Sequence, residues 1–204
     1  MDARGRVARE AARLLYTGSS EEYRQAKDMA ARSLGLDSMP SNFEVAVELD
    51  LLVEQSEGEG RRRLLMEMRI QALKIMRALS DYSPLLIGSV WRGTARKGSD
   101  IDITAYAVEH KDVESELIRS GYIVERSEEV DIMKECRMVR SRHITIPLEA
   151  GFEAEVVVRP PEERGEADIC EIYGDLKRGL NLHDLERLMK TDPLRKFVPR
   201  RRSR

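Results

Sequence analysis

The sequence lacks the features that mark membrane-bound and secreted proteins. No apolar run approaches the roughly 18 residues needed to cross a bilayer, and the first ten residues, MDARGRVARE, contain no apolar segment typical of a signal peptide. Only two cysteines occur, Cys136 and Cys170, and neither has a partner at the spacing of metal ligands, which indicates a reducing compartment. We therefore expect a cytoplasmic protein without membrane contact.

The chain also lacks an excess of charge of one sign. Although 35% of its 204 residues are charged, the formal net charge is only −2, which excludes a generally basic surface for nucleic acid. Two basic stretches, Arg61–Arg63 and the tail Arg200–Arg204, could contact RNA locally, but a solvated surface is the simpler explanation of both. With 41% hydrophobic residues, the chain is long enough for one good core and an attached module.

The N-terminal region is expected to be helical. Apolar residues recur at helical spacing in residues 4–16 and again in residues 21–34. Ser20 is the expected cap of the second helix, and Gly35 is its expected end. These helices would form most of an N-terminal module that spans residues 1–57.

A third helix and a joint should follow. Ser41 and Glu44 have the spacing of a capping box, which predicts a helix start just after Pro40. The small, acidic and Gly-rich segment 56–60 is predicted to be a flexible joint. Beyond it, a long amphipathic helix should lead to Ser80, because apolar residues recur there at three- and four-residue spacing: Leu65, Met68, Ala72, Ile75, Met76 and Leu79.

The most informative stretch is residues 85–107, LLIGSVWRGTARKGSDIDITAYA. It predicts a strand, a phosphate-binding turn at Gly88 and Ser89, a basic loop and a second strand. Strand side chains alternate between faces, so Asp100 and Asp102 should project together while the neighbouring isoleucines face a core. Like charges on one face repel each other unless a cation lies between them. The pair therefore indicates a site for a divalent cation.

The second half of the chain predicts further strands. A helix over residues 112–120 should end at Gly121, and strands are expected at residues 122–125, 143–148 and 152–158. The last two strands should form a hairpin through Glu149-Ala150-Gly151. In the second strand of this hairpin, Glu153 and Glu155 share one face. Residues 128–140 are ambiguous, and residues 161–204 indicate one or two short helices before a basic tail.

A spacing motif connects this stretch to a known family. Gly88-Ser89 is followed by ten residues and then by Asp100-Ile101-Asp102, a pattern that resembles the signature of the DNA polymerase beta superfamily of nucleotidyltransferases. The wording GSVWRGTARKGSDID is especially similar to archaeal CCA-adding enzymes and to minimal nucleotidyltransferases. The resemblance implies an α/β (α+β) fold, a nucleotidyltransferase palm with a short mixed sheet, preceded here by the N-terminal helical module.

The resemblance also implies a third carboxylate on a later strand. In the superfamily this acid stands in a hydrophobic setting that is often followed by valines and a proline. Glu155 fits best, because Val156, Val157 and Val158 follow it and Pro160 ends the strand. Glu153 on the same face is the alternative.

The implied chemistry is two-metal catalysis. Asp100, Asp102 and Glu155 would hold two Mg²⁺ ions through hard oxygen ligands. Glu155 would also be the general base, or the ligand that makes the metal-bound hydroxyl acidic. Gly88 has no Cβ, so the backbone could approach a triphosphate closely, and the Ser89 hydroxyl could donate to phosphate oxygens. The expected nucleotide contacts come from this turn and the basic loop, namely Gly88, Ser89, Arg92, Lys97 and Ser99.

Two histidines and the tryptophan are not assigned to the site. His143 and His183 are interpreted as surface or packing residues, because neither has a second histidine at ligand spacing. Trp91 fits a core position and a base-stacking position equally well. The predicted division of the chain is a helical module (1–57), a palm (58–160) and a C-terminal helical segment with a basic tail (161–204).

We therefore expect a magnesium-dependent enzyme that transfers a nucleoside monophosphate from a nucleoside triphosphate, ATP in the first instance, to a hydroxyl. RNA is one expected acceptor, and a hydroxyl of a partner protein, as in minimal nucleotidyltransferases that adenylylate a toxin, is another. A small molecule is a third. The alternative to an enzyme is a catalytically silent module that binds nucleotide or RNA. CCA addition is not expected, because the chain ends before the large domains that would grip a tRNA, and the sequence does not indicate an oligomeric state.

Overall fold

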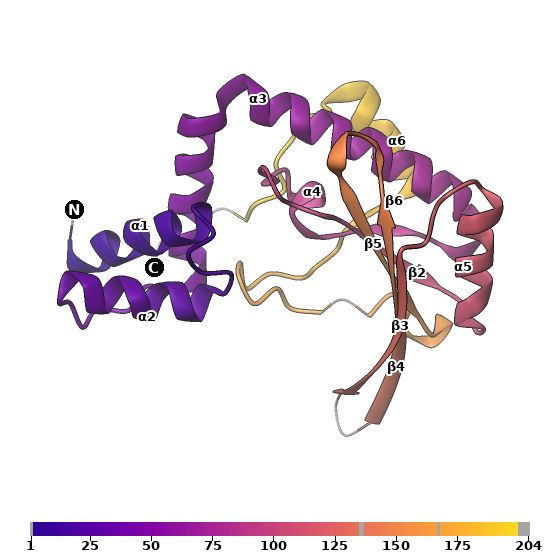
Figure 1. The fold of residues 1–204 in the computed structure, drawn as a ribbon, viewed down its shortest axis with the longest axis horizontal. Helices are drawn as coiled ribbons and strands as arrows, with labels where there is room; N and C mark the ends of the chain where they lie inside the picture. Colours follow the sequence, from indigo (N-terminus) through magenta and orange to yellow (C-terminus); the bar gives the residue numbers. More distant parts are fainter. Residues whose placement is uncertain (1, 135–136, 167, 200–204) are drawn as a thin grey trace. The chain divides into compact units, whose positions relative to one another are not determined.

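The computed structural model describes residues 2–134, 137–166 and 168–199, so Cys136 and the tail Arg200–Arg204 lie outside the described residues. Two compact units are present (Figure 1). The helical unit contains described residues of Met1–Arg61, Asp168–Leu176 and Pro199–Arg204, and the sheet unit contains those of Arg62–Ala167 and Lys177–Val198. Over the part of the chain that is described, no helix has the length and apolar character needed to cross a membrane. The division at residues 57 and 160 stays a prediction.

The helical unit packs around small side chains. It contains α1 (Ala3–Tyr16), α2 (Tyr23–Leu34) and the first part of α3 (Asn42–Ala78). Gly35 adopts the left-handed conformation that ends α2, as predicted, with a φ of 62°. The predicted Ser20 cap is wrong, because α2 begins at Tyr23 and the Ser20 hydroxyl instead donates to the Glu22 carbonyl. The core is rich in alanine, which lets the helices approach closely: Val7, Ala8, Ala11, Ala12, Ala26, Ala30, Ala31 and Val45.

The predicted capping box at the start of α3 is confirmed. The Ser41 amide donates to Glu44 Oε2 at 2.8 Å, and the Glu44 amide donates to Ser41 Oγ at 3.3 Å. Arg4 of α1 donates to the same carboxylate at 2.7 Å. Burial of Glu44 opposes ionisation, but these donors outweigh it and lower the pKa of Glu44 to about 2. The acid therefore links the starts of two helices.

The segment that we expected to be a flexible joint is helical apart from Gly58. Only Gly58 leaves the helical region, with φ 47° and ψ −124°, and it marks a kink within α3. Two glycines cost a helix about 1 kcal/mol each, yet Arg61 offsets part of this cost because its buried guanidinium donates to Asp50 and Glu54 before the kink. These bonds fasten the two sides of the kink together.

The sheet unit contains a six-stranded mixed sheet, which confirms the predicted fold class. Its strand order is β3-β4-β5-β2-β1-β6; β2 and β5 are parallel, and every other pair is antiparallel. The strands are β1 (Leu85–Leu86), β2 (Ile101–Tyr106), β3 (Arg126–Lys134), β4 (Arg137–Pro147), β5 (Glu153–Arg159) and β6 (Leu180–Asn181).

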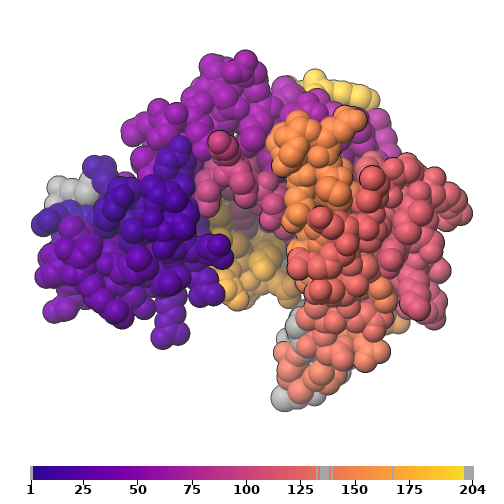
Figure 2. Space-filling model, viewed as in Figure 1, coloured from indigo at the N-terminus to yellow at the C-terminus, as the bar shows by residue number. Residues whose placement is uncertain are grey.

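The described residues of the ambiguous segment, 128–134 and 137–140, belong to the β3–β4 hairpin. Pairing with β5 begins at Arg142, so the part of β4 before it pairs with β3 alone and projects from the sheet (Figures 1 and 2). The predicted hairpin of β4 and β5 is confirmed and turns through η2 (Glu149–Gly151). A strand at residues 122–125 is wrong, because strand pairing starts only at Arg126.

Helices cover one face of the sheet and leave the other to polar side chains. The second part of α3, α5 (His110–Arg119) and α6 (Leu182–Thr191) contribute to one core with the inward side chains of β2, β4 and β5. Short 3-10 turns lie at Ser80–Tyr82 and Pro161–Glu163. The predicted apolar stripe is confirmed, because its five residues in α3 and Leu79, which directly follows the helix, are all at most 5% exposed. Each fully buried aliphatic side chain contributes about 1.5–3 kcal/mol to the stability of the fold. The packed face therefore stabilises the sheet that carries the polar side chains on its other face.

Candidate active site

A short helix, α4 (Gly88–Arg92), follows β1 where we predicted a turn. Gly88 has φ 69°, and a Cβ added there would lie 2.7 Å from Cγ of Asp102. Only glycine therefore leaves room for that carboxylate against the start of α4. The Ile87 amide also donates to the Asp102 carbonyl at 2.9 Å. The two halves of the spacing motif are thus in direct contact.

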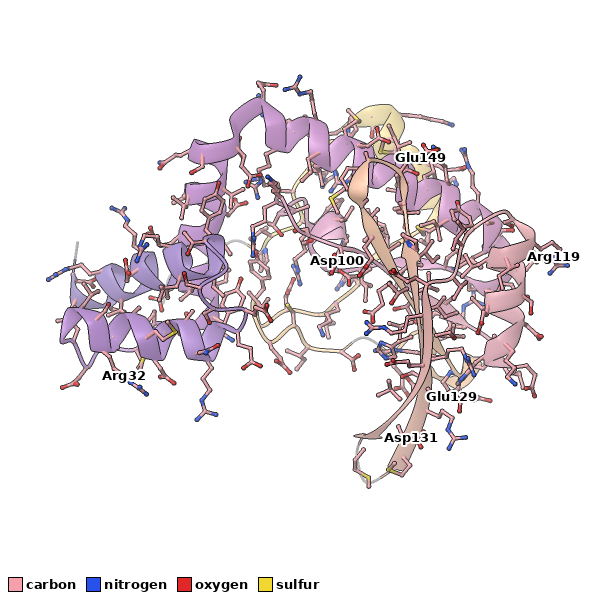
Figure 3. The ribbon with its side chains drawn as sticks, in the orientation of Figure 1. Arg32, Asp100, Arg119, Glu129, Asp131 and Glu149 are labelled. Atoms are coloured by element: carbon pink, nitrogen blue, oxygen red, sulfur yellow. The ribbon has the colours of Figure 1, made fainter. Side chains whose placement is uncertain are left out.

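The parallel pairing of β2 with β5 brings acids from distant parts of the sequence together. Asp102 lies directly opposite Glu155 in this register, and side chains of directly paired residues share one face of a sheet. Asp100 is exposed and immediately precedes β2, beside α4 in Figure 3. The sheet therefore carries Asp102 and Glu155 side by side, with Asp100 at the end of the strand.

The electrostatics show that these acids affect one another. Burial raises the pKa of Asp102 to about 6, and the negative charges of Glu155 and Asp100 add to this shift. Burial and then Glu155 likewise raise the pKa of Asp100. Among the described residues, no side chain gives Asp100 or Asp102 a hydrogen bond or an ion pair. Such uncompensated carboxylates would be stabilised by a cation.

The register also distinguishes the two glutamates of β5. Glu153 is exposed and lies opposite Pro147, whereas Glu155 lies opposite Asp102. This placement favours Glu155 as the third carboxylate. His143 Nδ1 lies 2.8 Å from Glu155 Oε1, a contact that the sequence analysis missed. Alternation along a hairpin of known turn length could have placed His143 on this face.

The basic loop after α4 is divided between buried and exposed residues. Arg92 is only 4% exposed, donates to the Phe197 carbonyl at 3.0 Å and lies 4.4 Å from the Trp91 ring. This placement favours a structural role for Arg92, and its phosphate contact stays a prediction. Ser99 is half-buried and its hydroxyl accepts from the Arg96 amide, while Lys97 is exposed. Trp91 itself is a core residue, 5% exposed.

Arg69 of α3 is a supporting residue that the sequence analysis missed. It is fully buried, and its guanidinium donates to the carbonyls of Val90 and Trp91 at 3.1 and 3.0 Å. It also donates to the carbonyls of Pro193 and Arg195 at 2.6 and 3.0 Å. Burial lowers the pKa of Arg69 to about 10, so the side chain remains charged at neutral pH. Arg69 thereby joins the end of α4 to the C-terminal segment.

The carboxylates fit a magnesium ion by donor chemistry. Asp100, Asp102 and Glu155 supply hard oxygen ligands, and the negative charge of Glu155 adds to the raised pKa of both aspartates. Within the described ranges, no three His, Cys, Asp or Glu side chains are gathered closely enough to hold a metal ion by themselves. This is the usual situation for Mg²⁺, which binds through one or two carboxylates together with substrate phosphates and water.

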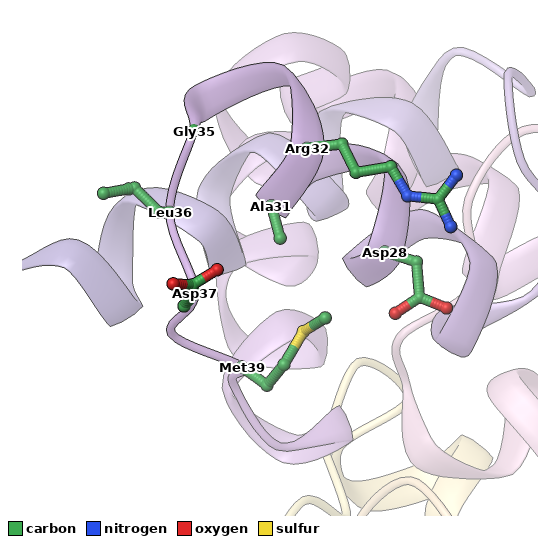
Figure 4. Close-up of a pocket in the computed structure, with 7 residues that line it drawn as sticks. All are labelled: Asp28, Ala31, Arg32, Gly35, Leu36, Asp37 and Met39. Atoms are coloured by element: carbon green, nitrogen blue, oxygen red, sulfur yellow. The ribbon is translucent and has the colours of Figure 1, made fainter.

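A separate cavity of about 260 Å³ lies in the helical unit at the end of α2 (Figure 4). Two acids and one arginine, Asp28, Asp37 and Arg32, line it with four small or apolar residues. None of the predicted site residues lines this cavity.

Comparison with known families agrees with the motif. Residues 69–153 match the family model described as a nucleotidyltransferase domain. This stretch is therefore similar to a nucleotidyltransferase domain, and the resemblance stated from Gly88, Ser89, Asp100 and Asp102 is confirmed. The match ends two residues before Glu155, so it leaves the third carboxylate untested.

Solved structures give weaker likenesses. The Cid1 poly(U) polymerase is 18% identical with a TM-score of 0.32, over 50% of this chain and 38% of that one. A cytoplasmic RNA terminal U-transferase is 19% identical with a TM-score of 0.30, over 57% of this chain and 34% of that one. The chain thus spans little more than a third of these proteins. A search among curated proteins found no match.

Proposed function

We propose that this protein transfers a nucleoside monophosphate from a nucleoside triphosphate, with ATP as the first candidate, to a hydroxyl group. The observation that carries the proposal is the placement of Asp102 opposite Glu155, with its carboxylate packed against Gly88 at the start of α4. A hydrophobic strand gains nothing from two adjacent carboxylates whose like charges repel each other. Their position together on the polar face of the sheet supports a role in binding cations and phosphates.

In the proposed reaction, the acceptor oxygen forms a bond to the α-phosphorus and the bond from that phosphorus to the bridging oxygen breaks, releasing pyrophosphate. Asp100, Asp102 and Glu155 would hold two Mg²⁺ ions, which would supply charge neutralisation and acidify the acceptor hydroxyl. Glu155 would take the hydroxyl proton as general base. The assignment agrees with the half-exposed position of Glu155, whose side chain is 39% accessible.

The residues that would hold the nucleotide lie between β1 and β2. Gly88 and Ser89 begin α4, so their amides and the Ser89 hydroxyl would face the triphosphate. Lys97 is exposed in the following loop and would neutralise phosphate charge, and Ser99 would shape the turn that carries it. Arg92 is the remaining nucleotide contact proposed from the sequence. Its buried contacts, however, favour a structural role in which it supports the loop.

RNA is the acceptor that we propose, because the tail Arg200–Arg204 is basic and the motif resembles that of CCA-adding enzymes, which act on RNA. The test is incubation of the protein with each of four α-labelled nucleoside triphosphates, Mg²⁺ and a cell extract, followed by separation of RNA, protein and small molecules. Label in RNA is expected. Label in protein would instead indicate adenylylation of a partner.

The matched control is Asp102→Asn, which keeps the shape of the side chain and removes its charge. Labelling that persists at the same level with this variant would refute the proposed site. A catalytically silent binding module would be indicated if no triphosphate gave labelling and if the affinity for nucleotide were the same with and without Mg²⁺.

A further inference from the structure

His143 makes the one hydrogen bond to the carboxylate of Glu155 among the described residues. Its Nδ1 lies 2.8 Å from Glu155 Oε1, and the two side chains are 34% and 39% exposed. The contact crosses from β4 to β5, whose pairing places His143 opposite Val157 and on the same face as Glu155. The fold, and not a chance surface contact, therefore presents the imidazole to the third acid.

We propose that His143 is a positioning residue that holds the Glu155 carboxylate for its part in nucleotidyl transfer; this inference rests on the proposed function. An ionised carboxylate can only accept, so the imidazole donates through its Nδ1 proton. Glutamate has three rotatable side-chain bonds and loses much freedom when it is fixed in one orientation. A hydrogen bond from a neighbouring strand fixes that orientation before the substrates arrive.

The geometry leaves the acid available for chemistry. Only Oε1 of Glu155 is engaged in the described structure, so Oε2 has no competing hydrogen bond. A fixed carboxylate with one free oxygen suits a metal ligand or a base, because partners that orient a ligand typically change affinity or activity about 10–100-fold. Asp102 has no such partner, but its packing against Gly88 restrains it sterically.

Two substitutions separate positioning from packing. His143→Ala removes the donor, whereas His143→Asn keeps an N–H close to the position of Nδ1. We expect kcat for nucleotidyl transfer to fall about 10–100-fold in His143→Ala, with the KM for the triphosphate nearly unchanged, and we expect His143→Asn to recover most of the loss. A loss of equal size in both variants would mean that the ring only packs, and would overturn the proposal.

A binding measurement distinguishes this inference from the proposed function. A nonhydrolysable ATP analogue is titrated by calorimetry with and without Mn²⁺, and the enhancement of its affinity by Mn²⁺ is compared between proteins. We expect the enhancement to fall about 10-fold in His143→Ala. No enhancement in the wild type would refute the metal site and the inference together. Full enhancement in both proteins would overturn the inference alone.

Thr145 offers the matched control. It lies on β4 directly opposite Glu155 and is 6% exposed, yet it makes no side-chain hydrogen bond to Glu155 in the described structure. Thr145→Val keeps its shape and should leave the Mn²⁺ enhancement and kcat unchanged. A loss as large as that of His143→Ala would show that any change on this strand disturbs the site, and would overturn the specific role of His143.

Discussion

Two acids, Glu44 in the helical unit and Asp102 in the sheet unit, have opposite surroundings. Glu44 accepts hydrogen bonds from Ser41 and Arg4, and its pKa falls to about 2. Burial, with a further contribution from the charges of Glu155 and Asp100, raises the pKa of Asp102 to about 6. Donors that surround an acid stabilise the fold, whereas acids that surround an acid destabilise it until a cation binds. The difference separates a structural link from a candidate site.

Two buried arginines, Arg61 and Arg69, differ in the charge of the groups to which they donate hydrogen bonds. Arg61 is 3% exposed and pairs with Asp50 and Glu54. Arg69 is fully buried and donates to four backbone carbonyls. Arg69, in the sheet unit, is thus bound by neutral groups, whereas Arg61, in the helical unit, is bound by acids.

The largest effect is expected from the two glutamates of β5. Glu155→Gln removes the charge opposite Asp102 and should lower kcat about 10³-fold, equivalent to about 4 kcal/mol. Glu153→Gln makes the same chemical change two residues away, opposite Pro147, and should change kcat less than about threefold. Steady-state transfer assays measure both. The reverse ranking would mean that Glu153 is the third carboxylate.

The next effect concerns Arg69. Arg69→Met should lower the free energy of unfolding by about 3–5 kcal/mol, because it leaves four buried carbonyls without their donor. Urea unfolding followed by circular dichroism measures the loss. Arg61→Met is the control in the helical unit, and we expect it to cost less because its partners, Asp50 and Glu54, are partly exposed. Equal losses would remove the distinction between the two arginines.

A smaller effect of opposite sign is expected for Asp102→Asn. The pKa of this carboxyl is raised from 3.8 to about 6, so the folded state binds the proton more tightly, and wild-type stability falls as pH rises from about 4 through 6. The variant should therefore be more stable by about 2 kcal/mol above pH 7, after a discount for partial exposure, and no more stable near pH 4. Thermal unfolding without metal tests this. A constant difference at both pH values would contradict the electrostatic cause.

The smallest effect is expected for Glu44→Gln in the helical unit. The pKa of Glu44 is lowered to about 2, so its contribution is present above its ordinary pKa and is lost as pH falls through 2. We expect a loss of about 1 kcal/mol at pH 7 and a smaller one at pH 2.5, measured by urea unfolding. A larger loss at the lower pH would reverse the sign and refute the assignment.

Local patterns predicted the elements well. The stripe of α3, the capping box at Ser41, the end of α2 at Gly35 and the β4–β5 hairpin all follow from spacing within a few residues. Two local predictions were wrong. Segment 56–60, expected to be a flexible joint, is helical apart from Gly58, and residues 122–125 do not pair as a strand.

The sequence by itself determined the class of this domain, because the Gly88-Ser89 and Asp100-Asp102 spacing is a local property of one stretch. It also favoured Glu155 as the third acid, with Glu153 as the alternative. Tertiary structure alone placed Glu155 opposite Asp102, gave it His143, and buried Arg92 and Arg69 against the C-terminal segment. The physical reason is that strand register and burial arise from pairing between segments far apart in the chain, which no local pattern specifies.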